Sequence, residues 1–400
     1  MRPFDGRRIV LGITGGIASY KAGWLARLLS HAGADVDVVM TRGATEFIAP
    51  ITFEALTGRP VQSDIFAQGR ALEHIKLARE AEGIVVAPCT ADFLARAAQG
   101  RADDLLAAIL LATEAPVLLV PAMNDRMWHH AATVRNAAVA RELGYRVLEP
   151  DTGMLAAGEG HGPGRMPEPE QIFEHVAKMM EEQSLASRTV LVTAGPTREA
   201  VDPVRFLSNR SSGRMGVAIA SAAWRRGAAV TLVAGPLEVP PPPGVTLVNV
   251  ETTDEMERAV ARALPAADAL VMAAAPADFR AAAPAGKKIK KADAPKALAL
   301  AQAPDILAAT RGARKKGAVI VGFALETDDV TANAKAKLEA KGLDLVVVND
   351  AREPGAGFQV ETNKVTLIGK DGRSESLPLM PKTEVADVLL DRVEALLRAR

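Results

Sequence analysis

Cysteine is almost absent from this chain, since Cys89 is the only one among 400 residues. A single cysteine cannot form an internal disulfide, which excludes a disulfide-stabilised secreted scaffold and favours a reducing compartment. Long apolar runs are missing as well: the run Ile9–Ile13 breaks at Gly15-Gly16, and no stretch reaches the roughly 18 apolar residues of a membrane span. The sequence therefore predicts a cytoplasmic protein that contacts no membrane.

Net charge is also lacking, because 48 Lys and Arg balance 48 Asp and Glu. Nucleic-acid binding needs a basic face, and the one local cluster of like charge is Lys287–Lys291. We therefore expect no nucleic-acid partner. The apolar share of 48% and the charged share of 24% are those of an ordinary globular protein. A chain of this length predicts two domains.

The first half alternates short apolar runs with helical patterns, which predicts a parallel sheet covered by helices on both faces. The expected strands are Arg8–Ile13, Val36–Met40, Ile84–Ala87, Val117–Val120 and Arg146–Leu148. Ligands of such sheets bind at the carboxyl ends of the strands. The turn Thr14–Ser19, TGGIAS, lies at one of these ends and is suited to binding a phosphate. Its spacing is not GxGxxG, so a generic NAD(P)-dependent oxidoreductase lacks its fingerprint.

Glycine concentrates in the segment Pro150–Met166, which contains five of them. Such a segment is not expected inside a sheet or a helix, and it predicts a linker or a mobile lid. A helix over Glu168–Glu182 follows. The polar joint Gln183–Ser187 then predicts the boundary between two domains, 1–183 and 188–400.

The second half repeats the alternation and predicts another doubly wound α/β domain. The expected strands are Val190–Val192, Ala229–Ala234, Val245–Val250, Asp268–Ala274, Val319–Phe323 and Leu343–Val348. A hairpin is expected over Phe358–Ile368, turning near Thr362-Asn363, with a second turn at Asp371-Gly372 after it, and an amphipathic helix over Glu384–Leu397.

The stretch Val190–Gly216, VLVTAGPTREAVDPVRFLSNRSSGRMG, joins a strand to a helix through an unusually long polar loop. Most such loops are short, so this length favours a functional segment over a solvated surface loop. Its arginines outnumber its acidic residues, an excess suited to phosphate or carboxylate groups. The lysines of Lys287–Lys291 also follow a strand end, and they are compatible with either polyphosphate contact or a solvated face.

Several motifs stand in the order of one known family. The first half contains GITGGIASYK, His74-Ile75, PCTAD, PAMNDRMW and GPGRM, and the second contains TAGPTREAVDPVRFLSNRSSGRMG, AAAPADFR, KKIKK, APDIL and GFALET. Together they resemble the bifunctional phosphopantothenoylcysteine decarboxylase/phosphopantothenate–cysteine ligase family of coenzyme A synthesis. The resemblance covers nearly the whole chain, and it implies an enzyme with both activities.

The resemblance implies that residues 1–183 form a flavodoxin-like domain that holds FMN and decarboxylates phosphopantothenoylcysteine to 4′-phosphopantetheine. Loss of CO₂ needs an electron sink, which the flavin creates by oxidising the thiol side of the substrate. His74 matches the family's catalytic base and Asn124 the residue that binds the substrate carboxylate, with Met127 and Arg165 beside the substrate. The implied FMN-binding residues are Gly15, Gly16, Ile17, Ala18, Thr41, Pro88, Thr90, Ala91 and Asp92.

The resemblance implies that residues 188–400 form a Rossmann-like ligase domain. It would activate 4′-phosphopantothenate with CTP and Mg²⁺ as an acyl-cytidylate, from which the amine of cysteine displaces CMP. Asn209 and Lys288 match catalytic residues, Asp278 a metal ligand, and Arg205 and Arg210 are expected substrate ligands. The implied CTP-binding residues are Ala273, Ala274, Ala275, Asp278, Lys288, Pro304, Asp305, Ile306, Leu307, Phe323, Lys337 and Lys341.

One position departs from the family pattern, in which a cysteine of the glycine-rich lid returns a proton during the final reduction. Ala157 stands there in this chain and has no transferable proton. The proton must then come from Glu159, His161 or water, or the decarboxylase half is impaired and only the ligase works. A flavin-binding regulatory protein is a further alternative, against which His74 and Asn124 argue.

The resemblance also implies a homo-oligomer, a dodecamer in which trimers of flavin domains are joined by ligase dimers. The flavin site of such trimers lies between subunits, so His74 would act on FMN held mainly by a neighbouring copy. Taken alone, a single histidine is more often structural than catalytic, and Cys89 is more often a packed side chain.

Overall fold

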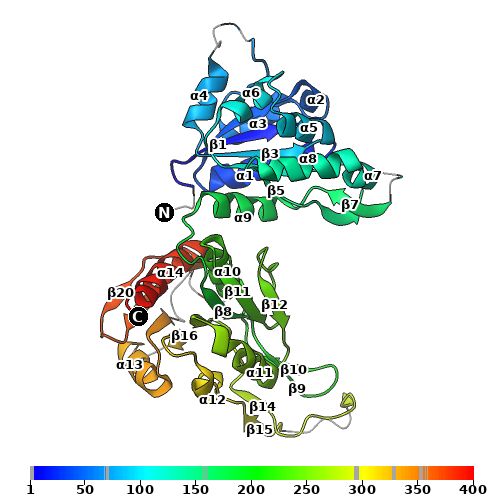
Figure 1. The fold of residues 1–400 in the computed structure, drawn as a ribbon. Coiled ribbons are helices and arrows are strands. Elements are labelled where there is room, and N and C mark those ends of the chain that lie inside the picture. Colours follow the sequence, from blue (N-terminus) through cyan, green and yellow to red (C-terminus); the bar gives the residue numbers. More distant parts are fainter. Residues whose placement is uncertain are drawn as a thin grey trace. The chain divides into compact units, whose positions relative to one another are not determined.

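A computed structural model describes residues 4–66, 68, 72–155, 158, 160–291, 297–326, 330–350, 355, 357 and 359–400 of the chain. The chain divides into two compact units, Met1–Glu181 and Glu182–Arg400 (Figure 1). Each unit has its own main sheet and its own buried cores.

The first unit contains a parallel sheet of five strands in the order β2-β1-β3-β4-β5. The strands are β1 (Arg8–Ile13), β2 (Asp35–Met40), β3 (Gly83–Cys89), β4 (Val117–Pro121) and β5 (Arg146–Val147). The helices are α1 (Ser19–His31), α2 (Arg42–Thr45), α3 (Pro50–Thr57), α4 (Glu73–Glu80), α5 (Ala91–Gln99), α6 (Leu105–Ala112), α7 (Asp125–His129), α8 (Ala131–Glu142) and α9 (Pro169–Met180). This strand order is the flavodoxin-like one.

Helices cover both faces of this sheet (Figure 1), and the alternation along each strand explains why. Ile9 and Leu11 of β1 pack in one core with α1, α3 and α9. Val10 points to the opposite face and packs in a second core with α4, α5, α6 and α8. All three side chains are fully buried. An apolar run with no polar alternation therefore marks a strand covered on both sides.

The glycine-rich segment forms a two-stranded antiparallel ribbon of β6 (Asp151–Met154) and β7 (His161–Arg165). The prediction that this segment joins no sheet was wrong, because such a ribbon needs only backbone hydrogen bonds, which glycine also makes. Glycine is required here at close approach: a Cβ on Gly164, which has a φ of +130°, would lie 2.2 Å from the carbonyl oxygen of Met123.

The second unit contains a sheet of eight strands in the order β12-β11-β8-β13-β16-β17-β19-β20. The strands are β8 (Thr189–Ala194), β11 (Ala229–Ala234), β12 (Thr246–Asn249), β13 (Ala269–Met272), β16 (Val319–Glu326), β17 (Leu345–Asp350), β19 (Val365–Gly369) and β20 (Ser374–Ser376). The helices are α10 (Arg214–Arg225), α11 (Thr253–Ala263), α12 (Ile306–Ala309), α13 (Val330–Lys341) and α14 (Lys382–Arg398), with short 3₁₀ turns at Leu264–Ala266 and Arg311–Ala313.

The strands from β12 to β17 are parallel, and β19 and β20 add an antiparallel edge. Numbered along the chain, the parallel strands lie in the order 3-2-1-4-5-6, which is that of the Rossmann fold. The predicted fold class, two doubly wound α/β domains with a flavodoxin-like and a Rossmann-like sheet, is therefore confirmed.

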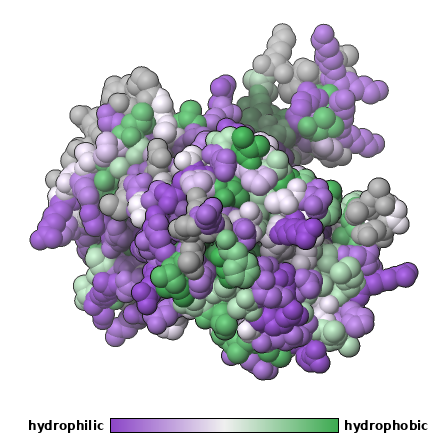
Figure 2. Space-filling view, turned by 90° about the horizontal axis from the view of Figure 1, so that it is seen from above, coloured by the Kyte–Doolittle hydropathy of each residue, from purple (hydrophilic) through white to green (hydrophobic). Residues whose placement is uncertain are grey.

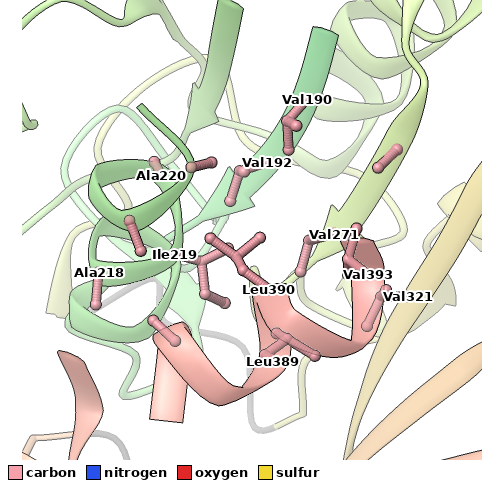
Figure 3. Packing of buried hydrophobic residues seen from close by; sticks show 14 of the residues in the cluster. Val190, Val192, Ala218, Ile219, Ala220, Val271, Val321, Leu389, Leu390 and Val393 are labelled. Carbon is pink, nitrogen blue, oxygen red and sulfur yellow. The ribbon is translucent and has the colours of Figure 1, made fainter. Parts of the chain in front are cut away.

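Two cores also flank the second sheet. Val190 and Val192 of β8 pack with Ile219 of α10 and with Leu390 and Val393 of α14 (Figure 3). The opposite face of the sheet packs against α11, α12 and α13. Helix α10 thus lies directly on β8, and this contact places the start of α10 beside the end of that strand.

The second unit also contains short two-stranded antiparallel ribbons. They pair β9 (Arg198–Ala200) with β10 (Phe206–Ser208), β14 (Phe279–Ala281) with β15 (Leu300–Gln302), and β18 (Thr362–Asn363) with β21 (Met380–Pro381). The predicted hairpin over Phe358–Ile368 was wrong. The hairpin of this region joins β19 to β20 through Asp371-Gly372, where Gly372 takes a φ of +82°, and Phe358 lies outside the described residues.

No described helix is both long and apolar enough to cross a membrane. On the face drawn in Figure 2, hydrophobic residues lie in separate patches among hydrophilic ones. Some large apolar side chains of the first unit are nevertheless exposed, among them Ile17, Tyr20 and Trp24 at the start of α1.

Candidate active sites

The two strand orders show where ligands can bind. In an open α/β sheet the binding crevice lies at the carboxyl ends of the two strands where the order reverses. In the first unit these strands are β1 and β3, and in the second unit they are β8 and β13. Cavities lie at both places.

The crevice of the first unit is a cavity of about 570 Å³, a size typical of small-molecule sites. The predicted residues that line it are Gly15, Gly16, Ile17, Ala18, Thr90, Ala91, Asn124, Met127 and Arg165. Residues missed by sequence reasoning also line it, namely Tyr20, Lys21, Ala122, Met123, Met154, Leu155, Gly164 and Met166. All of these lie within three residues of a predicted residue in the chain, or on or next to the β6–β7 ribbon.

Thr14 joins the two turns that form the crevice. Its hydroxyl donates a hydrogen bond to the carbonyl oxygen of Pro88 at 2.8 Å and accepts one from the N–H of Thr90 at 2.9 Å. Thr90 in turn caps α5 by accepting from the N–H of Phe93. A Cβ on Gly15 would lie 2.8 Å from the backbone of Gly43. The turn after β1 therefore packs too closely on Gly43 to carry a side chain at Gly15.

The β6–β7 ribbon closes one side of this cavity. The N–H of Met123 donates to the carbonyl oxygen of Gly164 at 3.0 Å. Lys21 is 5% exposed, and its Nζ donates to the carbonyl oxygen of Met166 at 2.9 Å and to Glu168 at 3.0 Å. Asn124 caps α7 by accepting from the N–H of Arg126, so its Nδ2 is the group that can donate to a carboxylate.

The crevice of the second unit holds two adjoining cavities of about 380 and 220 Å³. They share the predicted residues Ala274, Asp278, Phe323 and Lys337. The larger cavity is also lined by the predicted Asn209, Ala273 and Ala275, and the smaller by Pro304, Asp305, Ile306, Leu307 and Lys341. Most of the predicted nucleotide residues thus lie in one continuous site.

Hydrogen bonds order this site around the two strand ends. The Nδ2 of Asn209 donates to the carbonyl oxygens of Ala275 and Pro276, at 3.2 and 3.0 Å. On the other side, Lys341 pairs with Asp305 at 3.0 Å. Burial alone would raise the pKa of Asp305, but the hydrogen bond from Lys341 and the first N–H groups of α12 lower it, and the net shift is downward. The carboxylate therefore stays ionised beside the cavity.

Arg214, which the sequence offers as a possible phosphate ligand, lines the larger cavity, and so do polar residues to which sequence reasoning assigned no role: Ser211, Ser212, Asn349, Asn363 and Lys382. Asn349 had a usable signal, because it ends a parallel strand. Lys382 had no such signal in the sequence, because it begins α14, which follows no strand end of the parallel sheet. Lys382 is 5% exposed, and its Nζ donates to the carbonyl oxygens of Gly357 and Val360. Burial and then Arg214 lower its pKa to about 8, against the opposite effect of Glu361.

Two family models match the chain. The one described as "Flavoprotein" matches residues 2–181, and "DNA/pantothenate metabolism flavoprotein C-terminal domain" matches residues 185–397. The coenzyme A biosynthesis bifunctional protein CoaBC of Mycobacterium tuberculosis (strain ATCC 25618 / H37Rv) is 46% identical over 403 residues, which cover 97% of this chain and 96% of that protein. The CoaBC of Bacillus subtilis (strain 168) is 42% identical over 98% of both chains. The chain belongs to the CoaBC family.

Among solved structures, the C-terminal domain of a CoaBC protein is 38% identical, covers 55% of this chain and 100% of that domain, and has a TM-score of 0.47. The full-length relatives and the family models confirm the family predicted from the motifs. They also confirm the predicted enzyme class, a phosphopantothenate–cysteine ligase joined to a phosphopantothenoylcysteine decarboxylase, and a flavin as cofactor.

Some residues that the CoaBC resemblance implies do not line the cavity of the first unit. Thr41 is buried, the carbonyl of Pro88 accepts from Thr14, and Asp92 is exposed and pairs with Arg96 at 3.1 Å. His74 lies on α4, and its Nδ1 is buried without a hydrogen-bond partner in the described part of the chain. His74 is therefore not part of the cavity formed by its own chain.

Three implied residues of the second unit line neither of its cavities. Lys288 and Arg210 are exposed, and Arg205 pairs with Asp202 at 2.8 Å. Within the described residues no group of three or more His, Cys, Asp or Glu side chains could hold a metal ion. Asp278 is the exposed carboxylate that both cavities share.

The proton donors expected in place of a lid cysteine lie only partly within the described residues. Ala157 and Glu159 lie outside the described residues. Cys89 is fully buried, and burial raises the pKa of its thiol far more than Arg96 lowers it, so it cannot serve as an acid in the cavity. His161 lies directly opposite Met154, which lines the cavity. Opposite residues of a ribbon point to the same face, but His161 itself is exposed and does not line the cavity.

Proposed function

We propose that this chain converts 4′-phosphopantothenate to 4′-phosphopantetheine in two steps. The second unit joins cysteine to the substrate, and the first unit decarboxylates the product. One observation carries the proposal: each unit has a cavity at its own strand-order reversal, and residues that the motifs assign to that step are among those that line it. We also propose the domain assignment 1–183 and 188–400, which the nearby division of the chain at Glu181 and Glu182 supports.

In the ligation step, CTP occupies the two adjoining cavities of the second unit. Ile306, Leu307 and Phe323 offer apolar contacts to the base, while Lys337 and the start of α10 offer positive charge and N–H groups to the phosphates. Mg²⁺ fits this site as a companion of the nucleotide, because it commonly takes one or two carboxylates plus phosphate oxygens. Asp278 is the carboxylate available for that role.

The substrate carboxylate attacks the α-phosphorus of CTP, which forms an acyl-cytidylate and releases pyrophosphate. The amine of cysteine then displaces CMP to form an amide. Negative charge grows on the phosphates in the first step, and nearby cations stabilise it. Asn209 is proposed to hold the acyl-cytidylate. Lys288, Arg205 and Arg210 remain predictions, and they require a moving loop or a second copy to bring them to the cavity.

The cavity of the first unit fits FMN. The turn Gly15–Ala18 presents backbone for a phosphate, and the methionines and Ile17 supply apolar walls. A bound flavin supplies the electron sink for CO₂ loss by oxidising the thiol side of the substrate. Asn124 binds the departing carboxylate as an uncharged donor, so it adds no positive charge that would hold the carboxylate back. A proton from His161 or water, together with the two electrons that the flavin would have taken up, would then convert the ene-thiolate left by CO₂ to the thiol product.

We also propose the assembly that the family implies, a dodecamer of flavin-unit trimers joined by ligase dimers, in the cytoplasm. His74 lies outside its own cavity, and this position suits action on a flavin of a neighbouring copy. Ile17, Tyr20 and Trp24 are 67%, 60% and 57% exposed, and such apolar groups next to a cavity suggest a covered surface. Sedimentation of the purified protein would test the assembly, and a monomer would contradict it.

Separate assays of the two steps test the function. Purified protein is expected to carry a flavin absorption spectrum and to release CO₂ from added phosphopantothenoylcysteine. With 4′-phosphopantothenate, CTP, Mg²⁺ and cysteine it is expected to release CMP. CMP without CO₂ would instead favour a ligase joined to an impaired decarboxylase, the alternative that Ala157 suggests. Flavin binding without release of CO₂ or CMP would favour the alternative of a flavin-binding regulatory protein.

A further inference from the structure

A buried chain of hydrogen bonds runs beneath the ligase site. Ala277, which precedes Asp278, donates its N–H to the hydroxyl of Thr197 at 2.9 Å. The Oγ1 of Thr197 lies 2.9 Å from that of Thr253. Thr253 donates both its hydroxyl and its N–H to Glu199, at 2.9 and 2.8 Å. Thr197 is fully buried, and Thr253 and Glu199 are 1% and 4% exposed.

The direction of these bonds is determined by the groups themselves. The hydroxyl of Thr253 donates to Glu199 at 2.9 Å, and this contact is shorter than the 3.4 Å that separates it from the carbonyl oxygen of Ala277. Thr253 must then accept from Thr197, and Thr197 accepts from the N–H of Ala277. Every donor therefore points toward one charge, an arrangement that strengthens each bond.

The far end of this chain is anchored on a helix. Thr253 is the first residue of α11, a helix of 11 residues. Glu199 accepts the N–H of Thr253, so its negative charge lies at the positive end of that helix. Ribbon β9, helix α11 and the loop after β13 are thus connected through four residues.

The near end reaches both proposed functional residues of the larger cavity. Thr197 accepts from the hydroxyl of Ser208 through its carbonyl oxygen, at 2.7 Å, and Ser208 precedes Asn209. Asn209 itself holds the carbonyls of Ala275 and Pro276. Thr197 is therefore hydrogen-bonded to the residue before Asn209 and to the residue before Asp278.

We propose that Thr197, supported by Glu199, is a positioning residue for the ligation reaction that sets where Asp278 and Asn209 stand relative to the metal-bound phosphates of the nucleotide. Neither Thr197 nor Glu199 lines a cavity, so both act through the residues that do. The proposal rests on the CTP-dependent ligation proposed above.

Thr197→Val tests it most directly, because valine has nearly the shape of threonine and lacks the hydroxyl. We expect the turnover number for CMP release to fall about tenfold to a hundredfold. The Mg²⁺ concentration for half-maximal rate should rise, while the KM for cysteine stays unchanged. Titration calorimetry with CTP and Mg²⁺, without phosphopantothenate, should show weaker binding in the absence of turnover.

Two further variants separate positioning from folding. Thr197→Ser restores the hydroxyl and should recover both the Mg²⁺ dependence and the calorimetric affinity. Ser184→Ala removes a hydroxyl that donates to Glu394 at 2.7 Å, away from both cavities. This variant should leave the Mg²⁺ dependence and the calorimetric affinity unchanged. Unaltered CO₂ release from phosphopantothenoylcysteine would show that the first unit of each variant is intact.

Wild-type Mg²⁺ dependence and affinity in Thr197→Val, with only a lower melting temperature, would overturn the proposal and leave the chain of bonds a structural one. If Thr197→Val does not fold, Glu199→Gln keeps the shape and an acceptor but removes the charge. It should shift the Mg²⁺ dependence in the same direction, and no shift would overturn the proposal. Absence of CMP release from the wild-type protein would contradict the ligation function itself.

Discussion

Asn124 and Asn209 have comparable places in the two units. Each is an amide in the connection between a parallel strand and the next helix, β4 to α7 for Asn124 and β8 to α10 for Asn209, and each lines the cavity of its own unit. The Nδ2 of Asn124 can donate to a carboxylate without carrying charge, whereas the Nδ2 of Asn209 already donates to the carbonyl oxygens of Ala275 and Pro276. The two residues therefore allow each half of the proposed reaction to be disturbed separately.

Replacement of Asn124 by Ala should slow CO₂ release from phosphopantothenoylcysteine about tenfold to a hundredfold, because a hydrogen bond to a charged group is lost. Asn124→Asp should slow it more, since two carboxylates would then face each other. CMP release serves as the internal control and should not change. Equal losses in both assays would contradict the assignment of Asn124 to decarboxylation.

His175 of α9 should make the first unit sensitive to acid. Burial, with Lys178 and Arg146 acting in the same direction, lowers its pKa from 6.5 to about 4. Between these values the unfolded chain binds more protons than the folded one, so the free energy of unfolding falls as the pH drops from about 6.5 toward 4. The urea midpoint of the first unit measures this loss.

His175→Gln provides the matched comparison, because it removes the titration and keeps a polar side chain of similar reach. Its urea midpoint should depend less on pH over that interval than the midpoint of the wild type. An identical pH dependence in both proteins would assign the acid sensitivity to other groups.

At the scale of elements, sequence reading located the buried strands well and the short ribbons poorly. The runs Arg8–Ile13 and Ala229–Ala234 coincide with β1 and β11, because a strand covered on both faces reads as an unbroken apolar run. The pairing of β18 with β21 joins two segments of two residues each, with the hairpin of β19 and β20 between them. Such pairings depend on tertiary packing, which local pattern does not record.

The same distinction applies to the sites. Residues in the loops that follow a parallel strand, such as Gly15 after β1 and Asp278 after β13, were predicted and line cavities. Lys382 was missed because only the packing of α14 brings it to the site. His74 and Lys288 were predicted from motifs alone. Neither lines a cavity of its own unit, so their roles stay predictions.

The contact between α10 and β8 can be tested through Gly216. A Cβ there would lie 2.5 Å from the Cβ of Ala194 and 2.7 Å from the carbonyl oxygen of Thr193. Gly216→Ala should therefore push the start of α10 away from the site and lower the free energy of unfolding by about 1–3 kcal/mol. Gly312→Ala is the control, since a Cβ there meets nothing within 4 Å. Equal stability of the two variants would contradict the tight packing.

At the scale of the whole molecule, each unit has a complete sheet, its own cores and its own cavity. Separate production of residues 1–181 and 182–400 should therefore give one fragment that binds flavin and another that releases CMP. The absorption spectrum of the first and the nucleotide products of the second measure this. Loss of both properties on separation would show that the units depend on each other.

The most direct test of the central claim, that one chain performs both steps, is a mass-spectrometric product assay. Purified protein receives 4′-phosphopantothenate, CTP, Mg²⁺ and cysteine, and nucleotides are followed in the same samples. We predict 4′-phosphopantetheine together with CMP, formed by a decarboxylase that needs no lid cysteine. Phosphopantothenoylcysteine accumulating with CMP would confine activity to the second unit, and a sample with neither product nor CMP would contradict the account.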